Sequence, residues 1–215
     1  MDPNNCILPR DGPVSRPQWR AGSYLTAAAC GAEQNYRLQR FRRHDRQLHG
    51  WGVLCGLWVV SGNDGAHPWL VNICPGYAIG PYGDEIELRA PAPVDVTDYL
   101  WFQPPAAFAG LVLPSIAYVV VRYQAWRDDL RVVPGGACEC KEPVYGESRT
   151  GDGYQAGVIW TPPEDLQSPG ACKPESQPCP PCPDSPWLTL AKIELPQPGA
   201  AITTAMIDNG IRVTL

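Results

Sequence analysis

The chain has 215 residues and a formal net charge of −5, from 22 acidic and 17 basic side chains. With 44% hydrophobic residues, 8 Trp and 9 Tyr, it is too apolar to be disordered throughout, and its negative charge argues against a general nucleic-acid coat. No apolar run is long enough to span a membrane, and the first residues lack the basic and apolar regions of a secretory signal. We therefore expect a cytoplasmic protein with one core or two small ones.

The N-terminal part of the chain predicts an extended arm followed by one α-helix. Residues 1–22 are polar and rich in proline, which suits an arm that packs on the domain or on another subunit. Thr26 is a suitable N-cap, and the sequence then continues without proline to Gly50. Leu38, Phe41 and Leu48 recur along one helical stripe. Gly50 then has the place of a C-terminal stop, so the helix is expected to end there.

The rest of the chain predicts antiparallel strands. Segments rich in β-branched and aromatic residues alternate with turn signals such as SGNDG and Asn209-Gly210, and the second of these favours a type I′ turn. Residues 94–100 are expected as a connecting segment. The expected strands are 51–60, its partner 69–74, two short strands within 75–88, a central strand at 115–126, then 154–160 and 187–195, with a closing hairpin in 201–215.

These elements predict an α+β, mainly β fold, with one N-terminal α-helix packed on antiparallel sheets and long proline-rich loops. Nine prolines between 162 and 186 exclude regular ladder pairing there. The expected organisation is an arm at 1–22, a helix and β core at 23–133, a Cys/Pro-rich loop insertion with one strand at 134–186, and a C-terminal β-hairpin region at 187–215 that completes the core.

The chain has nine cysteines. One of them, Cys6, lies in the arm, and the other eight fall into two groups. Cys30, Cys55 and Cys74 lie in apolar segments, where a free cysteine is usually a small buried hydrophobe. The other group lies in the Gly- and Pro-rich region, as a CEC pair, a CPPC pair and one cysteine between them. Pairs with this spacing are typical of a tetrahedral zinc site, with disulfides and free thiols as the alternatives. The candidate metal or disulfide residues are Cys138, Cys140, Cys172, Cys179 and Cys182.

The densest polar cluster is RRHDRQLHGWG at residues 42–52. A basic C-terminal turn complements the helix dipole and can pair with acidic residues of a neighbouring subunit, which favours an interface over anion binding or catalysis. His44 and His49 are five positions apart, whereas two imidazoles that share a zinc ion on a helix are four apart. The expected interface residues are Arg37, Arg40, Arg43, Arg46, His49 and Trp51.

Motifs of the common enzyme classes are absent from the sequence. It contains no GxSxG elbow, no phosphate loop with GK[ST] and no GxGxxG after a strand. Asp84, Glu85 and Glu87 belong to a hairpin, where solvated or cross-strand charges are the default. We therefore expect that the chain is not an enzyme.

Two stretches of the chain carry a resemblance. The first is GSYLTA followed by EQNYRLQRFRRHDRQLHGWGVLCGLWV, and the second is VNICPGYAIGPYGDEIEL. Over roughly residues 22–89 they resemble a family of proteins encoded with contractile injection systems and phage-tail-like particles, and CPDSPWLTLAKIEL with IDN matches more weakly. The chain departs from the family at Ala28-Ala29, where an acidic–aromatic pair is usual, and at Gly80, where Asp is frequent.

The resemblance implies a structural component of a tail-like particle, at the baseplate, the collar or a surface-attached extension, without catalytic residues. It implies an oligomer whose partners are copies of itself and other particle subunits, assembled in the cytoplasm. Two alternatives remain open. One is a small zinc-stabilised module that binds a peptide or glycan on Trp58, Trp69 and Trp126, and the other is a hydrolase-like enzyme that uses the region of His44 and His49.

Overall fold

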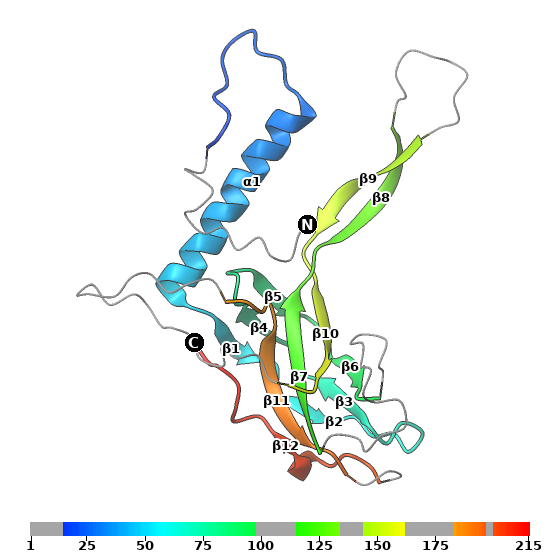
Figure 1. The fold of residues 1–215 in the computed structure, drawn as a ribbon. Coiled ribbons are helices and arrows are strands. Elements are labelled where there is room, and N and C mark those ends of the chain that lie inside the picture. The colour runs from blue at the N-terminus through cyan, green and yellow to red at the C-terminus, as the bar shows by residue number, and fades with distance from the viewer. Residues whose placement is uncertain (1–14, 98–114, 134–143, 162–182, 197–199) are drawn as a thin grey trace, which may run out of the picture.

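The computed structural model of the chain describes residues 15–97, 115–133, 144–161, 183–196 and 200–215. These residues form one long helix and four sheets, in which every strand pair is antiparallel (Figure 1). Within these ranges, no helix combines the length and the apolar character that crossing a bilayer requires. The α+β, mainly β fold class is therefore confirmed.

Helix α1 (Ala27–His44) begins where the sequence predicts. The Thr26 hydroxyl accepts a hydrogen bond from the Ala29 amide at 3.1 Å, which satisfies one of the free donors of the first turn. A π-helical turn, Asp45–His49, continues α1, and Gly50 ends it with φ 84°. The positive φ suits glycine because it has no Cβ to clash with the backbone.

Helix α1 does not lie across a sheet face, which differs from the expected packing. None of its residues is buried, and Figure 1 shows it standing away from the sheets and meeting them at its C-terminal end. The physical reason is its composition, because polar side chains surround the helix and leave too few apolar positions for a core-facing stripe. The described part of the N-terminal arm contacts the helix, with Arg16 over the Tyr36 ring at 5.9 Å.

Two long, kinked hairpins make up most of the β structure. In the first, β1 (Gly52–Gly56) pairs with β4 (Gly76–Ile79), and β2 (Val59–Ser61) pairs with β3 (Leu70–Ile73). The register of Cys55 and Gly56 continues across the break between β1 and β2, and it shifts by one residue between Val53 and Cys55. The break lies at Leu57, whose φ is 54° although its side chain is fully buried. The single strand expected at 51–60 is thus divided between two sheets.

The second hairpin is kinked in the same way. Strand β7 (Ile116–Tyr123) continues into β8 (Trp126–Val133), and β9 (Val144–Gly151) continues into β10 (Tyr154–Ile159), with one unchanged register. The inner half lies in the main sheet, while the outer half, β8–β9, projects as a two-stranded ribbon (Figure 1). In the loop insertion expected at 134–186, only the strand at 154–160 was predicted, whereas residues 144–151 also form a strand, β9.

The remaining strands complete three sheets. Their orders are β1-β4-β5, β2-β3-β6 and β10-β7-β11-β12, so β7 is central as expected. One hydrophobic core joins all three, from Trp51 to Ile207. The strands that lie outside the two hairpins are β5 (Glu85–Leu88), β6 (Ala92–Asp95), β11 (Leu188–Glu194) and β12 (Ile207–Asp208).

The C-terminal segment differs from the hairpin expected in 201–215. A short 3₁₀ turn, Thr204–Met206, leads into β12, which pairs with β11 instead of with the residues after it. The Asn209 side chain bonds to both backbone groups of Val59, at 2.9 and 3.0 Å, so the expected turn residues anchor the chain to β2. Strand β6 also differs from the expectation, because it includes the first two residues of the connecting segment expected at 94–100.

Candidate interface and adjoining groove

Every residue of helix α1 is exposed or half-buried. Phe41 is 67% exposed, and Tyr24 and Leu25, just before the helix, are 92% and 73% exposed. Leu48 in the π turn is also exposed. Isolated apolar residues are normal on a protein surface, but here they lie on an element with no buried side of its own.

The six expected interface residues divide into exposed and buried ones. Arg37 forms an exposed ion pair with Glu33 at 3.1 Å, and Arg40 bonds to the Tyr36 hydroxyl at 3.4 Å. Arg43 and His49 are also exposed. Arg46 and Trp51 are only 5% and 4% exposed, so their side chains belong to the interior of this chain and contribute little to its outer surface.

Arg42 and Gly83 anchor the end of α1 to the sheets. The Arg42 guanidinium donates to the Asp84 carboxylate at 2.5 Å and lies over the Tyr123 ring at 5.7 Å. Gly83, with φ 83°, lets the β4–β5 turn approach so closely that a Cβ there would overlap the Arg42 carbonyl oxygen. Burial raises the pKa of Asp84, and the charge of Arg42 opposes that rise. The hairpin carboxylate expected to be solvated is thus part of the helix anchor.

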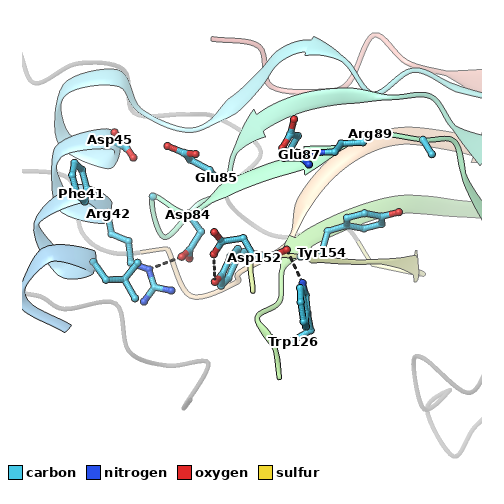
Figure 2. Close-up of a pocket in the computed structure, with 15 residues that line it drawn as sticks. Phe41, Arg42, Asp45, Asp84, Glu85, Glu87, Arg89, Trp126, Asp152 and Tyr154 are labelled. Atoms are coloured by element: carbon cyan, nitrogen blue, oxygen red, sulfur yellow. Dashed lines mark hydrogen bonds and ion pairs between the residues drawn. The ribbon is translucent and has the colours of Figure 1, made fainter. Parts of the chain in front are cut away.

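A groove of about 820 Å³ opens beside this anchor, between the end of α1, the β4–β5 turn and the bases of β8 and β9 (Figure 2). Its charged lining is mostly acidic, and its two arginines each pair with a lining carboxylate, Arg42 with Asp84 and Arg89 with Glu87. The acidic side chains are Asp45, Asp84, Glu85, Glu87 and Asp152, and the aromatic ones are Phe41, Tyr123, Trp126 and Tyr154.

Burial, and after it the neighbouring acidic groups, raises several pKa values in and beside this groove. Burial and the charge of Glu85 raise the pKa of Tyr77 to about 12. Burial also raises the pKa of Tyr123, whose hydroxyl donates to Asp152 at 2.8 Å. Burial, followed by the charge of Glu85, raises the pKa of Asp45. The groove therefore favours a positively charged group over a negative one.

The π turn corrects the expectation about the two histidines. Because its hydrogen bonds run from i to i+5, residues five apart come onto one side of the helix. The rings of His44 and His49 are 5.4 Å apart between centroids, and their ligand atoms and that of Asp45 all lie within 4.8 Å of one another. A regular α-helix would have separated the two imidazoles by about 140° around its axis.

The cysteines give a divided result. Cys138, Cys140, Cys172, Cys179 and Cys182 lie outside the described residues, so the predicted metal or disulfide site stays a prediction. Cys30, Cys55 and Cys74 are free thiols. The expected burial of these three was wrong, because Cys55 is exposed and the other two are half-buried.

Comparisons with known proteins give matches only among solved structures. No protein-family model matches the chain, and no curated protein matches it. A chain of the type VI secretion system TssK-TssF-TssG baseplate subcomplex is 12% identical, with a TM-score of 0.41 over 86% of this chain and 58% of that one.

Two further structures come from the same secretion system. The crystal structure of TssK is 11% identical, with a TM-score of 0.46 over 89% of this chain and 41% of that one. The baseplate complex from the type VI secretion system is 13% identical, with a TM-score of 0.44 over 86% and 56%. The chain thus spans between 41% and 58% of the length of the chains it matches.

The three tryptophans considered as a binding platform do not form one. Trp69 is 6% exposed and donates its indole N–H to the Ala200 carbonyl at 2.9 Å. Arg212 covers Trp58, with its guanidinium carbon 3.6 Å from the ring centroid. Trp126 lines the groove and donates to the Asp152 carbonyl at 2.9 Å.

Sequence reasoning did not find the groove. Asp152 and Trp126 are far apart in the sequence and meet only because β8 and β9 pair. One local signal was present in the sequence. Gly-Asp-Gly at residues 151–153 could have indicated a kink between two strands, next to which Trp126 lies.

Proposed function

We propose that this chain is a non-enzymatic structural subunit of a contractile-injection-system or phage-tail-like particle that acts through protein–protein contacts. Its place is at the baseplate, the collar or a surface-attached extension. The observation that carries the proposal is helix α1, an 18-residue helix with no buried residue, attached to a body that has a well-formed core.

An unsupported helix of this kind is marginal in water. Helices of this length gain most of their stability in proteins from packing an apolar face, and no residue of α1 is buried in the described structure. The same reasoning applies to the β8–β9 ribbon, because a lone two-stranded hairpin is marginal by itself. Both elements gain a packing surface when a neighbouring subunit covers them, and Tyr24, Leu25 and Phe41 supply apolar area for such a contact.

The sequence resemblance supports the same function. The residues that carry it, 22–89, comprise the lead into α1, the helix itself, the π turn and the hairpin that anchors it. The motif therefore covers the projecting element together with its attachment. Arg40 and Arg43, which are exposed there, suit an acidic partner surface, and the acidic groove suits a basic one.

The test is co-purification from the native cell. A tagged wild-type chain is expected to elute from a sizing column within a large particle, together with sheath, tube and baseplate proteins identified by mass spectrometry. Phe41→Asp should leave a folded chain that no longer enters the particle. Leu54→Asp, at a position that is 59% exposed on β1, is the matched control and should still enter.

Two outcomes contradict the proposal. The first is a folded wild-type chain that elutes as a monomer at high concentration and without particle proteins. The second is equal incorporation of the Phe41→Asp variant and the wild type, because the exposed helix would then not be the contact surface.

A further inference from the structure

We propose that His44, Asp45 and His49 form a binding site for one first-row divalent cation, such as Zn²⁺, at the base of helix α1. The site is separate from the cysteine pairs and goes beyond the proposed structural function. It rests on the π turn, which brings together two imidazoles and a carboxylate from three positions of one short segment.

The backbone of this segment is defined on both sides. Asp45–His49 follows α1 without a break, and the Gly50 amide bonds to the Asp45 carbonyl at 3.0 Å, which closes the turn. Gly50 then leaves the helix with φ 84°. Single π turns are rare and frequently lie at functional sites. Here the turn has a definite chemical result, because it places His44 and His49 on the same side.

The distances suit a metal ion. In a tetrahedral zinc site with bonds of about 2.0–2.1 Å, neighbouring ligand atoms are about 3.3 Å apart. The three ligand atoms here lie within 4.8 Å of one another. Both histidines are exposed and Asp45 is half-buried, so small side-chain rotations can close the remaining difference without moving the core.

The donor types define the class of ligand. Two neutral imidazoles and a carboxylate suit Zn²⁺, Co²⁺ or Ni²⁺ better than Ca²⁺ or Mg²⁺, which prefer sets of oxygen ligands. Water, or a side chain of a neighbouring subunit, completes the coordination. Glu85 points toward Asp45 from the adjoining groove (Figure 2), so a bound cation also offsets the repulsion between these two carboxylates.

Zinc content measured on the purified full chain tests the site. After equilibrium dialysis against Zn²⁺, elemental analysis should find one zinc fewer per chain in His44→Ala/His49→Ala than in the wild type. His67→Ala is the matched control, since His67 lies 3.1 Å from Asp64 but has no second imidazole in its cluster. It should bind as much zinc as the wild type. Asp45→Asn should weaken binding at least tenfold.

Cobalt separates this site from the cysteines. Co²⁺ held by thiolates gives a strong charge-transfer band, whereas Co²⁺ on imidazole and carboxylate gives only weak visible bands. The weak bands should disappear in the double histidine variant and stay in His67→Ala. Nitrogen resonances of His44 and His49, but not of His67, should shift when Zn²⁺ is added.

Each remaining outcome overturns the proposal. Equal zinc content in the wild type and the double variant would place any bound ion elsewhere, and a thiolate band alone would assign it to cysteines. Absence of binding to the wild type would remove the site. Circular dichroism verifies that the variants are folded, and His44→Gln/His49→Gln replaces the alanine pair if those variants unfold.

Discussion

Gly83 is the residue at which the β4–β5 turn touches the end of α1. Its φ of 83° strains any residue with a Cβ, and the adjacent Arg42 carbonyl leaves no room for that atom. We expect Gly83→Ala to lower the free energy of unfolding by about 3 kcal/mol, from left-handed strain of about 1–2 kcal/mol and overpacking of about 1–3 kcal/mol. Urea denaturation followed by fluorescence measures this change.

Gly65→Ala is the matched control for Gly83→Ala. Gly65 has the same φ of 83°, but nothing lies within 4 Å of a Cβ there. It should therefore lose only about 1 kcal/mol, through the backbone strain. Equal losses in the two variants would show that the contact with Arg42 does not hold the helix end.

Tyr77 should make the protein less stable in alkali. Burial and the nearby Glu85 raise its pKa from 10.0 to about 12 in the folded chain. The folded state therefore holds this proton more tightly than the unfolded state does. The contribution of Tyr77 to the free energy of unfolding is complete below pH 10 and is lost as pH rises through about 12. Unfolding by urea at pH values between about 9 and 12 should show a shallower decline for Tyr77→Phe than for the wild type.

The control for Tyr77→Phe is Tyr24→Phe, at a position that is 92% exposed. Its curve should follow that of the wild type. If Tyr77→Phe declines as steeply as the wild type, the environment described for this phenol is incorrect.

Single residues of the site were only partly predictable from the sequence. The basic end of α1 was found because arginines cluster in the sequence, and its exposure follows from its polarity. Arg46 and Trp51 were expected at an interface but are buried, because the π turn changes the direction of the side chains in and after it relative to a regular helix. The choice between an α and a π turn depends on tertiary contacts, so local patterns could not reveal it.

At the scale of elements, α1 should open locally and independently of the sheets. The Thr26 side chain caps its first turn, and among the described residues no part of α1 belongs to the buried core. Thr26→Ala should cost about 1 kcal/mol locally and speed amide hydrogen exchange in these turns about fivefold, while the global free energy of unfolding stays the same.

Ser23→Ala, just outside the helix, is the control for the Thr26 cap and should not change the exchange rates. If Thr26→Ala lowers the global free energy of unfolding by the same amount as the local one, α1 unfolds together with the sheets and its independence is disproved.

The elements themselves were predicted where local signals were strong. The N-cap at Thr26, the end at Gly50 and strands β7, β10 and β11 followed from composition and turn residues. The break at Leu57 could not be predicted, because a leucine with φ 54° is not favoured locally and is held there by complete burial. Strands β8 and β9 were missed because their polar composition lacks the alternation that marks a half-buried strand.

At the scale of the whole molecule, one core should give one unfolding transition. Ile86 and Leu190 belong to different sheets, and both are 0% exposed within the same buried cluster. We expect Ile86→Ala and Leu190→Ala each to cost about 2–5 kcal/mol and to shift a single cooperative transition. Thermal unfolding followed by fluorescence and by circular dichroism measures it.

Leu54→Ala, at an exposed position on β1, should change the melting temperature little and serves as the control. Two separate transitions, one shifted by each core variant, would instead show that the sheets unfold as independent units.

The fold class was predictable because helix and strand signals sum over the whole chain. The division of the strands among four sheets was not, since it depends on two kinks and on pairing between distant strands such as β7 and β11. Local sequence carries little information about such distant pairs.

The kinked hairpin of β1 to β4 has a consequence for the order of folding. Its two arms stay paired from the turn before β3, across the kink, to the start of β1, so every contact in it joins residues close in the sequence. Loop closure for such contacts costs little entropy, whereas β11 must wait for a much longer loop to close onto β7. We therefore expect this hairpin to zip first, from the loop after Ser61 toward Gly52, and to provide the template on which the later strands assemble.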